Sequence, residues 1–292
     1  MHITIDYFKS LIGIRSEEDS EYGGVKANWL QPKNMDVSGG RLTMEEVDKV
    51  ADFENRKEII TISGLTQETF EYFISKYGKQ FKVIRFFKNK MVEDWSLLST
   101  LPNLEYIYWF HNQRITKLWD MSNNTNLKAI CLSDFSRLRK LDGIEKAPNL
   151  ELFSLKDAVW DKNDIETYTC FKNTNIRFLH FGARKILDED VSFVKEMPYL
   201  ECFECSPYLF PTEKIAWVMA NCPNIKGSAL NMFIDTYAYD KQSGRYDVPA
   251  LCLTGKGKRK FAATNEAKKN KIADEFMDMV EKYRGKEYYE VF

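Results

Sequence analysis

The sequence predicts a curved α/β solenoid, with parallel strands on the concave face and helices or turns on the convex face. The first observation behind this prediction is a three-residue motif that begins with proline or threonine and ends with leucine or isoleucine. A motif that returns at a nearly fixed period is typical of repeat architectures, in which each unit buries its apolar face against its neighbours. The motif occupies residues 102–104, 125–127, 148–150, 174–176, 198–200 and 223–225.

The second observation is the apolar spacing that follows each motif. When the last motif residue is counted as place one, apolar residues recur at places one, four and six, as in Leu104, Ile107 and Trp109. Places four and six point to the same side of a strand, so each unit is expected to add one strand to a sheet. The same frame extends in both directions and gives nine units that start 23 to 26 residues apart. Their first places are residues 57, 81, 104, 127, 150, 176, 200, 225 and 248.

This pattern resembles the leucine-rich repeat, over roughly residues 57–254 or about two-thirds of the chain. That family uses an asparagine at the ninth place to satisfy backbone groups at a turn. Only Asn89 and Asn112 match it here, so the array is degenerate and is similar to those of bacterial leucine-rich repeat proteins. The resemblance implies a scaffold for protein recognition.

The segments between the predicted strands favour helices or turns on the convex side. In the first unit, apolar residues follow the spacing of an amphipathic helix, and Thr66 is placed to cap its amino end. A second helical pattern runs from Ile215 to Cys222, whereas the shorter units have apolar residues three apart, as expected for tight turns.

Residues 1–56 are the predicted amino-terminal cap of the array. A cap is needed because a terminal unit would otherwise expose its apolar layer and an unpaired strand edge. Thr43 and Glu46 form a capping box, which predicts a short helix at this point. Residues 16–40 are polar and interrupted by glycines, so a loop is expected there.

Residues 255–292 are the predicted carboxyl-terminal cap. A helix is expected over about residues 265–284, because one face of this segment is apolar. That face should cover the ninth strand. It consists of Ile272, Phe276, Val280 and Tyr283.

Composition points to a folded protein outside the membrane. The chain has 44% hydrophobic residues, 29% charged residues and a net charge of −1, which gives no overall attraction to nucleic acid or anionic lipid. No stretch approaches the roughly 20 apolar residues that a membrane-spanning helix needs. The six cysteines are scattered, as expected for free thiols in a reducing cytoplasm. We therefore expect a cytoplasmic monomer without a cofactor.

Two local signals have simpler explanations than a ligand site. Cys202 and Cys205 are three residues apart on a predicted strand, so they should point to opposite faces and not share a metal ion. The basic run at residues 255–260 lacks the spacing of a phosphate-binding loop. A solvated turn is the preferred interpretation of this run, and attraction of an acidic partner or a nucleic acid is the alternative.

The candidate site lies on the concave face, where alternation places the third, fifth and seventh residues of each strand. Aromatic side chains and an arginine gather there on adjacent strands, and such residues anchor many protein interfaces. An exposed apolar patch usually marks a binding site. The alternative is that a cap segment, such as the amino-terminal loop, folds across this face and buries it. The predicted partner-binding residues are Arg85, Phe87, Tyr106, Tyr108, Phe110, Leu152, Phe178, His180 and Glu204.

Three polar side chains on the same face suggest an enzyme instead. Ser154, His180 and Glu204 occupy the same place on three consecutive predicted strands, in the order of a serine hydrolase triad. The sequence has neither a nucleophile elbow nor a glycine-rich oxyanion loop. The favoured function is therefore a non-catalytic protein-recognition scaffold, of which an inhibitor or immunity-type antagonist is one form. A hydrolase that uses this triad is the alternative.

Overall fold

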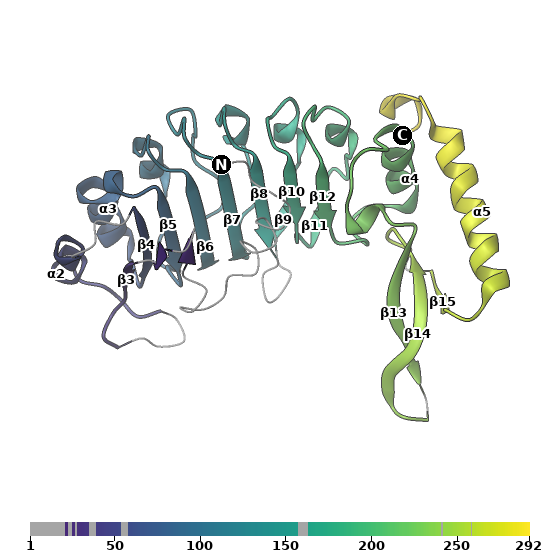
Figure 1. Cartoon of the computed structure of the whole chain (residues 1–292), viewed down its shortest axis with the longest axis horizontal. Helices are drawn as coiled ribbons and strands as arrows, with labels where there is room; N and C mark the ends of the chain where they lie inside the picture. The colour runs from purple at the N-terminus through teal and green to yellow at the C-terminus, as the bar shows by residue number, and fades with distance from the viewer. Residues whose placement is uncertain are drawn as a thin grey trace.

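The protein is described by a computed structural model, which has a mixed α/β fold built around one large parallel sheet (Figure 1). The structure describes residues 21–22, 25–26, 28–34, 39–53, 58–156, 163–240, 242–257 and 259–292.

The main sheet has eight parallel strands, and their order in the sheet follows their order in the chain. Equivalent places of successive units lie side by side, since Ile84 pairs with Ile107 and Ile107 pairs with Ile130. The predicted strands of the first seven units are therefore confirmed. The strands are β3 (Asn28–Leu30), β4 (Ile59–Ser63), β5 (Val83–Phe87), β6 (Tyr106–Asn112), β7 (Ala129–Phe135), β8 (Leu152–Lys156), β10 (Phe178–Phe181) and β12 (Cys202–Cys205).

The main core lies between one face of this sheet and the segments that return from one strand to the next. Those segments are mostly short 3₁₀ helices, which bring apolar residues such as Phe171 and Phe193 into the core. Two returns are longer α-helices, and Thr66 caps the first of them as predicted. The returns are α3 (Gln67–Lys76), η2 (Gly78–Gln80), η3 (Ser96–Thr100), η4 (Ile144–Lys146), η5 (Thr169–Phe171), η6 (Ser192–Val194) and α4 (Thr212–Asn221), with a small parallel pair of β9 (Asp164–Ile165) and β11 (Lys185–Ile186).

The inward places of the frame are buried as predicted, and Leu155 at place six has no exposed surface. Shortening it to alanine removes buried methyl groups and leaves a cavity between neighbouring units. We expect Leu155→Ala to lower the free energy of unfolding by about 2 to 5 kcal/mol. Urea denaturation measures this loss. Leu187→Ala is the matched control, because Leu187 is 54% exposed. Equal losses for the two variants would contradict the assignment of place six to the core.

The amino-terminal side of the array contains more strand than the sequence suggests. Thr43 and Glu46 form the predicted capping box at the start of α2 (Met44–Val47), which continues into η1 (Asp48–Asp52). The predicted loop at residues 16–40 is wrong in its described part. It holds β3, which adds an edge strand beside β4, and the antiparallel pair β1 (Glu21–Tyr22) and β2 (Val25–Lys26).

A ladder of alternating charge runs along the starts of the strands. Place two of eight successive units is alternately acidic and basic, and neighbouring units bridge one another, as in Lys82–Glu58 at 2.7 Å and Lys128–Glu105 at 2.8 Å. Such half-exposed pairs add little stability individually. Opposite charges on adjacent strands do favour the observed register, because a shift of one strand along its neighbour would move the paired charges apart. The ladder consists of Glu58, Lys82, Glu105, Lys128, Glu151, Arg177, Glu201 and Lys226.

The prediction for the last two units is wrong. Residues 225–230 contribute one parallel bridge at Lys226 and the short η7 (Ser228–Leu230). The rest of the eighth unit and the start of the ninth form an antiparallel hairpin of β13 (Phe233–Asp240) and β14 (Arg245–Leu253), to which β15 (Lys260–Ala262) adds a third strand. The turn explains the difference, because the Asp240 carboxylate accepts hydrogen bonds from the backbone N–H groups of Gln242 and Ser243, and Gly244 adopts a left-handed φ of 68°.

The carboxyl-terminal helix forms as predicted but covers a different neighbour. In α5 (Glu266–Tyr283) all four predicted apolar residues are buried. The helix and the following η8 (Tyr288–Glu290) pack against α4 and not against a ninth strand (Figure 1). The Trp217 indole N–H of α4 donates to the Lys286 carbonyl at 3.1 Å, and the Asn221 amide donates to the Tyr283 carbonyl at 3.1 Å. Among the described residues, no helix is long and apolar enough to cross a membrane.

Candidate functional site

The predicted partner-binding residues lie on the sheet face opposite the main core, which we call the second face. Alternation along each strand separates them from the core residues, as predicted. The second face is not open to water along its length, because its third-place side chains, together with Cys131 at place five, form an apolar cluster of their own. That cluster contains Ile59, Val83, Tyr106, Ala129, Cys131, Leu152, Phe178 and Cys202, with Tyr108 packed against it.

Burial corrects the prediction that these side chains are exposed. Tyr106 is 3% exposed, Leu152 0%, Phe178 1% and Arg85 7%. A parallel sheet is expected to be buried on both faces when its strands carry apolar residues on both of their sides. These values favour the alternative of intramolecular cover. Much of the amino-terminal loop that we predicted as the cover lies outside the described residues.

The remaining aromatic residues of the predicted site are half-buried and do lie together. The rings of Phe87 and Phe110 are stacked, with their centroids 5.3 Å apart, and Trp29 of β3 lies 6.0 Å from Phe87. The guanidinium of Arg85 lies 5.8 Å from the Tyr108 ring. The structure therefore brings Arg85, Phe87, Tyr108 and Phe110 into one group, of which Arg85 is the buried member.

The predicted triad residues are neighbours, but their contacts differ from those of a hydrolase. Ser154 Oγ and His180 Nδ1 are 2.9 Å apart. The Glu204 carboxylate accepts hydrogen bonds from the Ser228 backbone N–H at 3.0 Å and from the Ser228 hydroxyl at 2.5 Å. Ser154 is only 1% exposed, so a substrate carbonyl has no open route to its hydroxyl. Burial, and then the charge of Lys156, lower the pKa of His180 to about 4, which leaves a neutral imidazole at pH 7.

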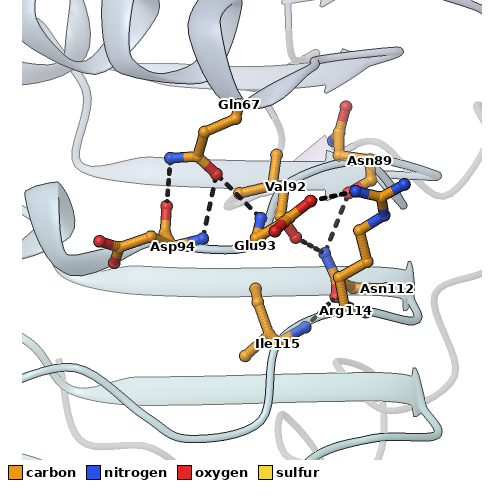
Figure 2. A network of polar contacts seen from close by, with 8 residues as sticks. All are labelled: Gln67, Asn89, Val92, Glu93, Asp94, Asn112, Arg114 and Ile115. Atoms are coloured by element: carbon orange, nitrogen blue, oxygen red, sulfur yellow. Dashed lines mark hydrogen bonds and ion pairs between the residues drawn. The ribbon is translucent and has the colours of Figure 1, made fainter.

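Two strands are followed or ended by a buried asparagine that bonds to the backbone of nearby turns. These are the ninth-place residues Asn89 and Asn112. Both side chains are buried and bond to the backbone of neighbouring turns (Figure 2). Asn89 Oδ1 accepts from the Leu65 N–H at 2.7 Å, and its Nδ2 donates to the Ile62 carbonyl at 2.9 Å. The residue before each asparagine has a left-handed backbone, with φ of 55° at Lys88 and 63° at His111. These turns therefore hold their loops in fixed, equivalent positions.

Three exposed tyrosine side chains lie together on the hairpin of β13 and β14, which we call the tyrosine arm. Tyr237 is 58% exposed, Tyr239 53% and Tyr246 70%, and Val248 beside them is 39% exposed. The rings of Tyr239 and Tyr246 pair across the two strands at 5.2 Å. The arm projects away from the main sheet (Figure 1). The apolar spacing alone did not predict this surface, because it fits parallel units, although alternating tyrosines before a glycine turn are a hairpin signal.

The basic run at residues 255–260 is largely engaged within the chain, and residue 258 lies outside the described residues. Lys256 pairs with Glu189, and Arg259 pairs with Glu275 at 3.0 Å. The Lys260 ammonium donates to the Tyr237 carbonyl at 2.6 Å. These contacts favour a structural turn over an anion-binding patch.

The chemistry of the described residues offers no obvious metal centre, since no group of three or more His, Cys, Asp or Glu side chains is placed to hold an ion. Cys202 belongs to the second-face cluster and Cys205 to the main core, so the prediction that they point to opposite faces is confirmed.

Comparison with known proteins gives no further guide to the site. No protein-family model matches the sequence, and no curated protein matches it.

Proposed function

We propose that the protein is a non-catalytic protein-recognition scaffold, built as a degenerate leucine-rich-repeat solenoid. Two features support the repeat assignment. Seven consecutive frames supply parallel strands in chain order, and the ninth-place asparagines bond to backbone groups of adjacent units. A scaffold of this kind gains a wide, rigid surface without needing a catalytic centre.

The tyrosine arm is the observation that carries the proposal. Three tyrosines more than half exposed contribute little to the fold, yet they lie together on a projecting hairpin. Tyrosine buries a large ring at low entropic cost and can also donate a hydrogen bond, which makes it a frequent anchor of protein interfaces. An antagonist that places this arm against an enzyme or toxin is one concrete form of the function. The half-buried group of Phe87, Tyr108 and Phe110 is a second contact surface in this proposal.

Replacing the arm tyrosines should weaken partner binding without unfolding the protein. The partner is first captured from the source cell with the intact protein, and its dissociation constant is then measured by calorimetry. We expect Tyr237→Ala and Tyr246→Ala each to cost about 1 to 3 kcal/mol of binding free energy, with an unchanged melting temperature. Tyr199→Ala is the matched control, because Tyr199 is 59% exposed but lies outside the arm.

Two outcomes would count against the arm. If both arm variants bound the partner with wild-type affinity and Phe110→Ala bound it more weakly, the binding surface would be the second face. Ester or amide turnover that disappears in His180→Ala would instead favour the hydrolase, which the 2.9 Å contact between Ser154 and His180 keeps as the alternative.

A further inference from the structure

A polar depression of about 410 Å³ opens at the ends of β5, β6 and β7. Its walls come from the loops that leave these three adjacent strands. The repeat stacks equivalent loops at the spacing of neighbouring strands, so side chains far apart in sequence meet here. The lining residues are Lys90, Met91, Glu93, Gln113, Arg114 and Arg137.

The first two loops are tied to their neighbours by the hydrogen bonds that Figure 2 shows. The Gln67 side chain of α3 accepts from the backbone N–H groups of Glu93 and Asp94 and donates to the Asp94 carbonyl. Asn112 Nδ2 donates to the Val92 carbonyl at 2.9 Å, and Asn112 Oδ1 accepts from the Arg114 N–H at 2.9 Å. A site whose backbone is fixed in advance loses less entropy when a ligand binds.

The depression has an excess of positive charge. Lys90, Arg114 and Arg137 supply three cations, and Glu93 is the one carboxylate in the lining. Glu93 pairs with Arg114. Neither Lys90 nor Arg137 forms an ion pair with another residue in the part of the chain that the structure describes. Two cations of the lining, the half-buried Lys90 and the exposed Arg137, are therefore available to an anion from solution.

We propose that this depression binds an oxyanion, the phosphate or carboxylate of a small molecule. Arginine guanidinium groups and a lysine ammonium are the donors that such anions prefer, and a volume of a few hundred Å³ suits a small ligand. Glu93 competes with the anion for Arg114. The site is independent of the tyrosine arm and does not rest on the proposed protein-recognition function.

The test is a titration of the full chain with inorganic phosphate and, separately, with acetate at low ionic strength, followed by amide chemical shifts. We expect saturable shifts in the loops at residues 90–93 and 113–114. Arg137→Gln and Lys90→Gln should each weaken binding by roughly tenfold, because each removes a charge-assisted hydrogen bond. Glu93→Gln should strengthen binding, because it releases Arg114. Tighter binding of phosphate identifies a phosphate-bearing ligand, and equal or tighter binding of acetate identifies a carboxylate.

Matched controls separate a site from a general effect of net charge. Lys79→Gln and Glu68→Gln make the same charge changes at exposed positions outside the lining, and both should leave the affinity unchanged. Shifts that do not saturate would overturn the proposal. It would also be overturned if the control variants changed the affinity as much as the lining variants.

Discussion

Deleting residues 261–292 should make the protein aggregate or dimerise and lower its melting temperature. The deletion removes most of β15 together with α5 and η8, and the apolar side chains of α5 and η8 cover α4. Trp217 of α4 is fully buried, and its ring lies 5.2 Å from that of Tyr288. In a repeat array each unit is held mainly by its neighbours, so an uncovered terminal helix presents its apolar layer to other molecules. Size-exclusion chromatography with light scattering and a thermal melt measure both effects.

A pair of point variants tests the same packing without truncation. Phe276 is 1% exposed and the next residue, Met277, is 43% exposed. Phe276→Ala should cost about 3 to 5 kcal/mol of unfolding free energy, whereas Met277→Ala should cost no more than about 0.5 kcal/mol. If the truncated protein stayed monomeric and melted like the full chain, α5 would not be a cap. Its apolar face would then need another explanation.

Five of the seven correctly predicted strands of the main sheet meet two requirements at once, whereas the strands of the first two units have the apolar spacing alone. Ile107 and Trp109 face the core at places four and six, and the motif before them sets the start of the strand. The structure also explains why asparagine recurs in that motif. The Asn149 side chain donates to the Thr125 carbonyl at 2.7 Å, which is the first motif residue of the preceding unit, and Asn175 does the same to Pro148 at 2.6 Å. Local pattern and contacts between units therefore agree.

The same pattern fails at residues 225–253 because apolar spacing does not distinguish a parallel strand from one arm of a hairpin. Val248, Leu251 and Leu253 fit the frame, yet they lie on β14. Strand direction is decided by the turn, where Asp240 and Gly244 allow the chain to reverse directly into an antiparallel partner. The turn chemistry outweighs the periodicity at this point.

The candidate site was harder to predict than the fold, because burial of the second face depends on the whole chain. Alternation correctly places Tyr106 and Phe178 on that face, but it does not report whether anything covers them. The depression that we propose as an oxyanion site could not be predicted from the repeat spacing, for a different reason. Lys90 is at place ten of its unit and Arg137 is at place eleven of its own, so the two do not share a repeat position. Only the stacking of the loops brings them together.

Asn112→Ala should be among the most damaging single substitutions in the array. The Asn112 side chain donates to the carbonyls of Asn89 and Val92 and accepts from the backbone N–H groups of Arg114 and Ile115, at 2.9 to 3.0 Å. Asn112 is fully buried, so water does not replace these partners freely. A buried polar group that loses its partner costs about 1 to 3 kcal/mol. We therefore expect a total loss of about 3 to 5 kcal/mol, measured by urea denaturation.

Asn149→Ala is the matched control, because Asn149 is exposed and its side chain makes one hydrogen bond to the backbone. Its expected cost is no more than about 1 kcal/mol, since water can satisfy the Thr125 carbonyl. The difference between the two losses compares the buried, turn-forming asparagine at place nine with the exposed asparagine of the three-residue motif, which makes a single hydrogen bond. A small loss for Asn112→Ala would mean that the turn holds without its side chain. The loops that line the depression would then owe their fixed positions to other contacts, such as those of Gln67 with Glu93 and Asp94.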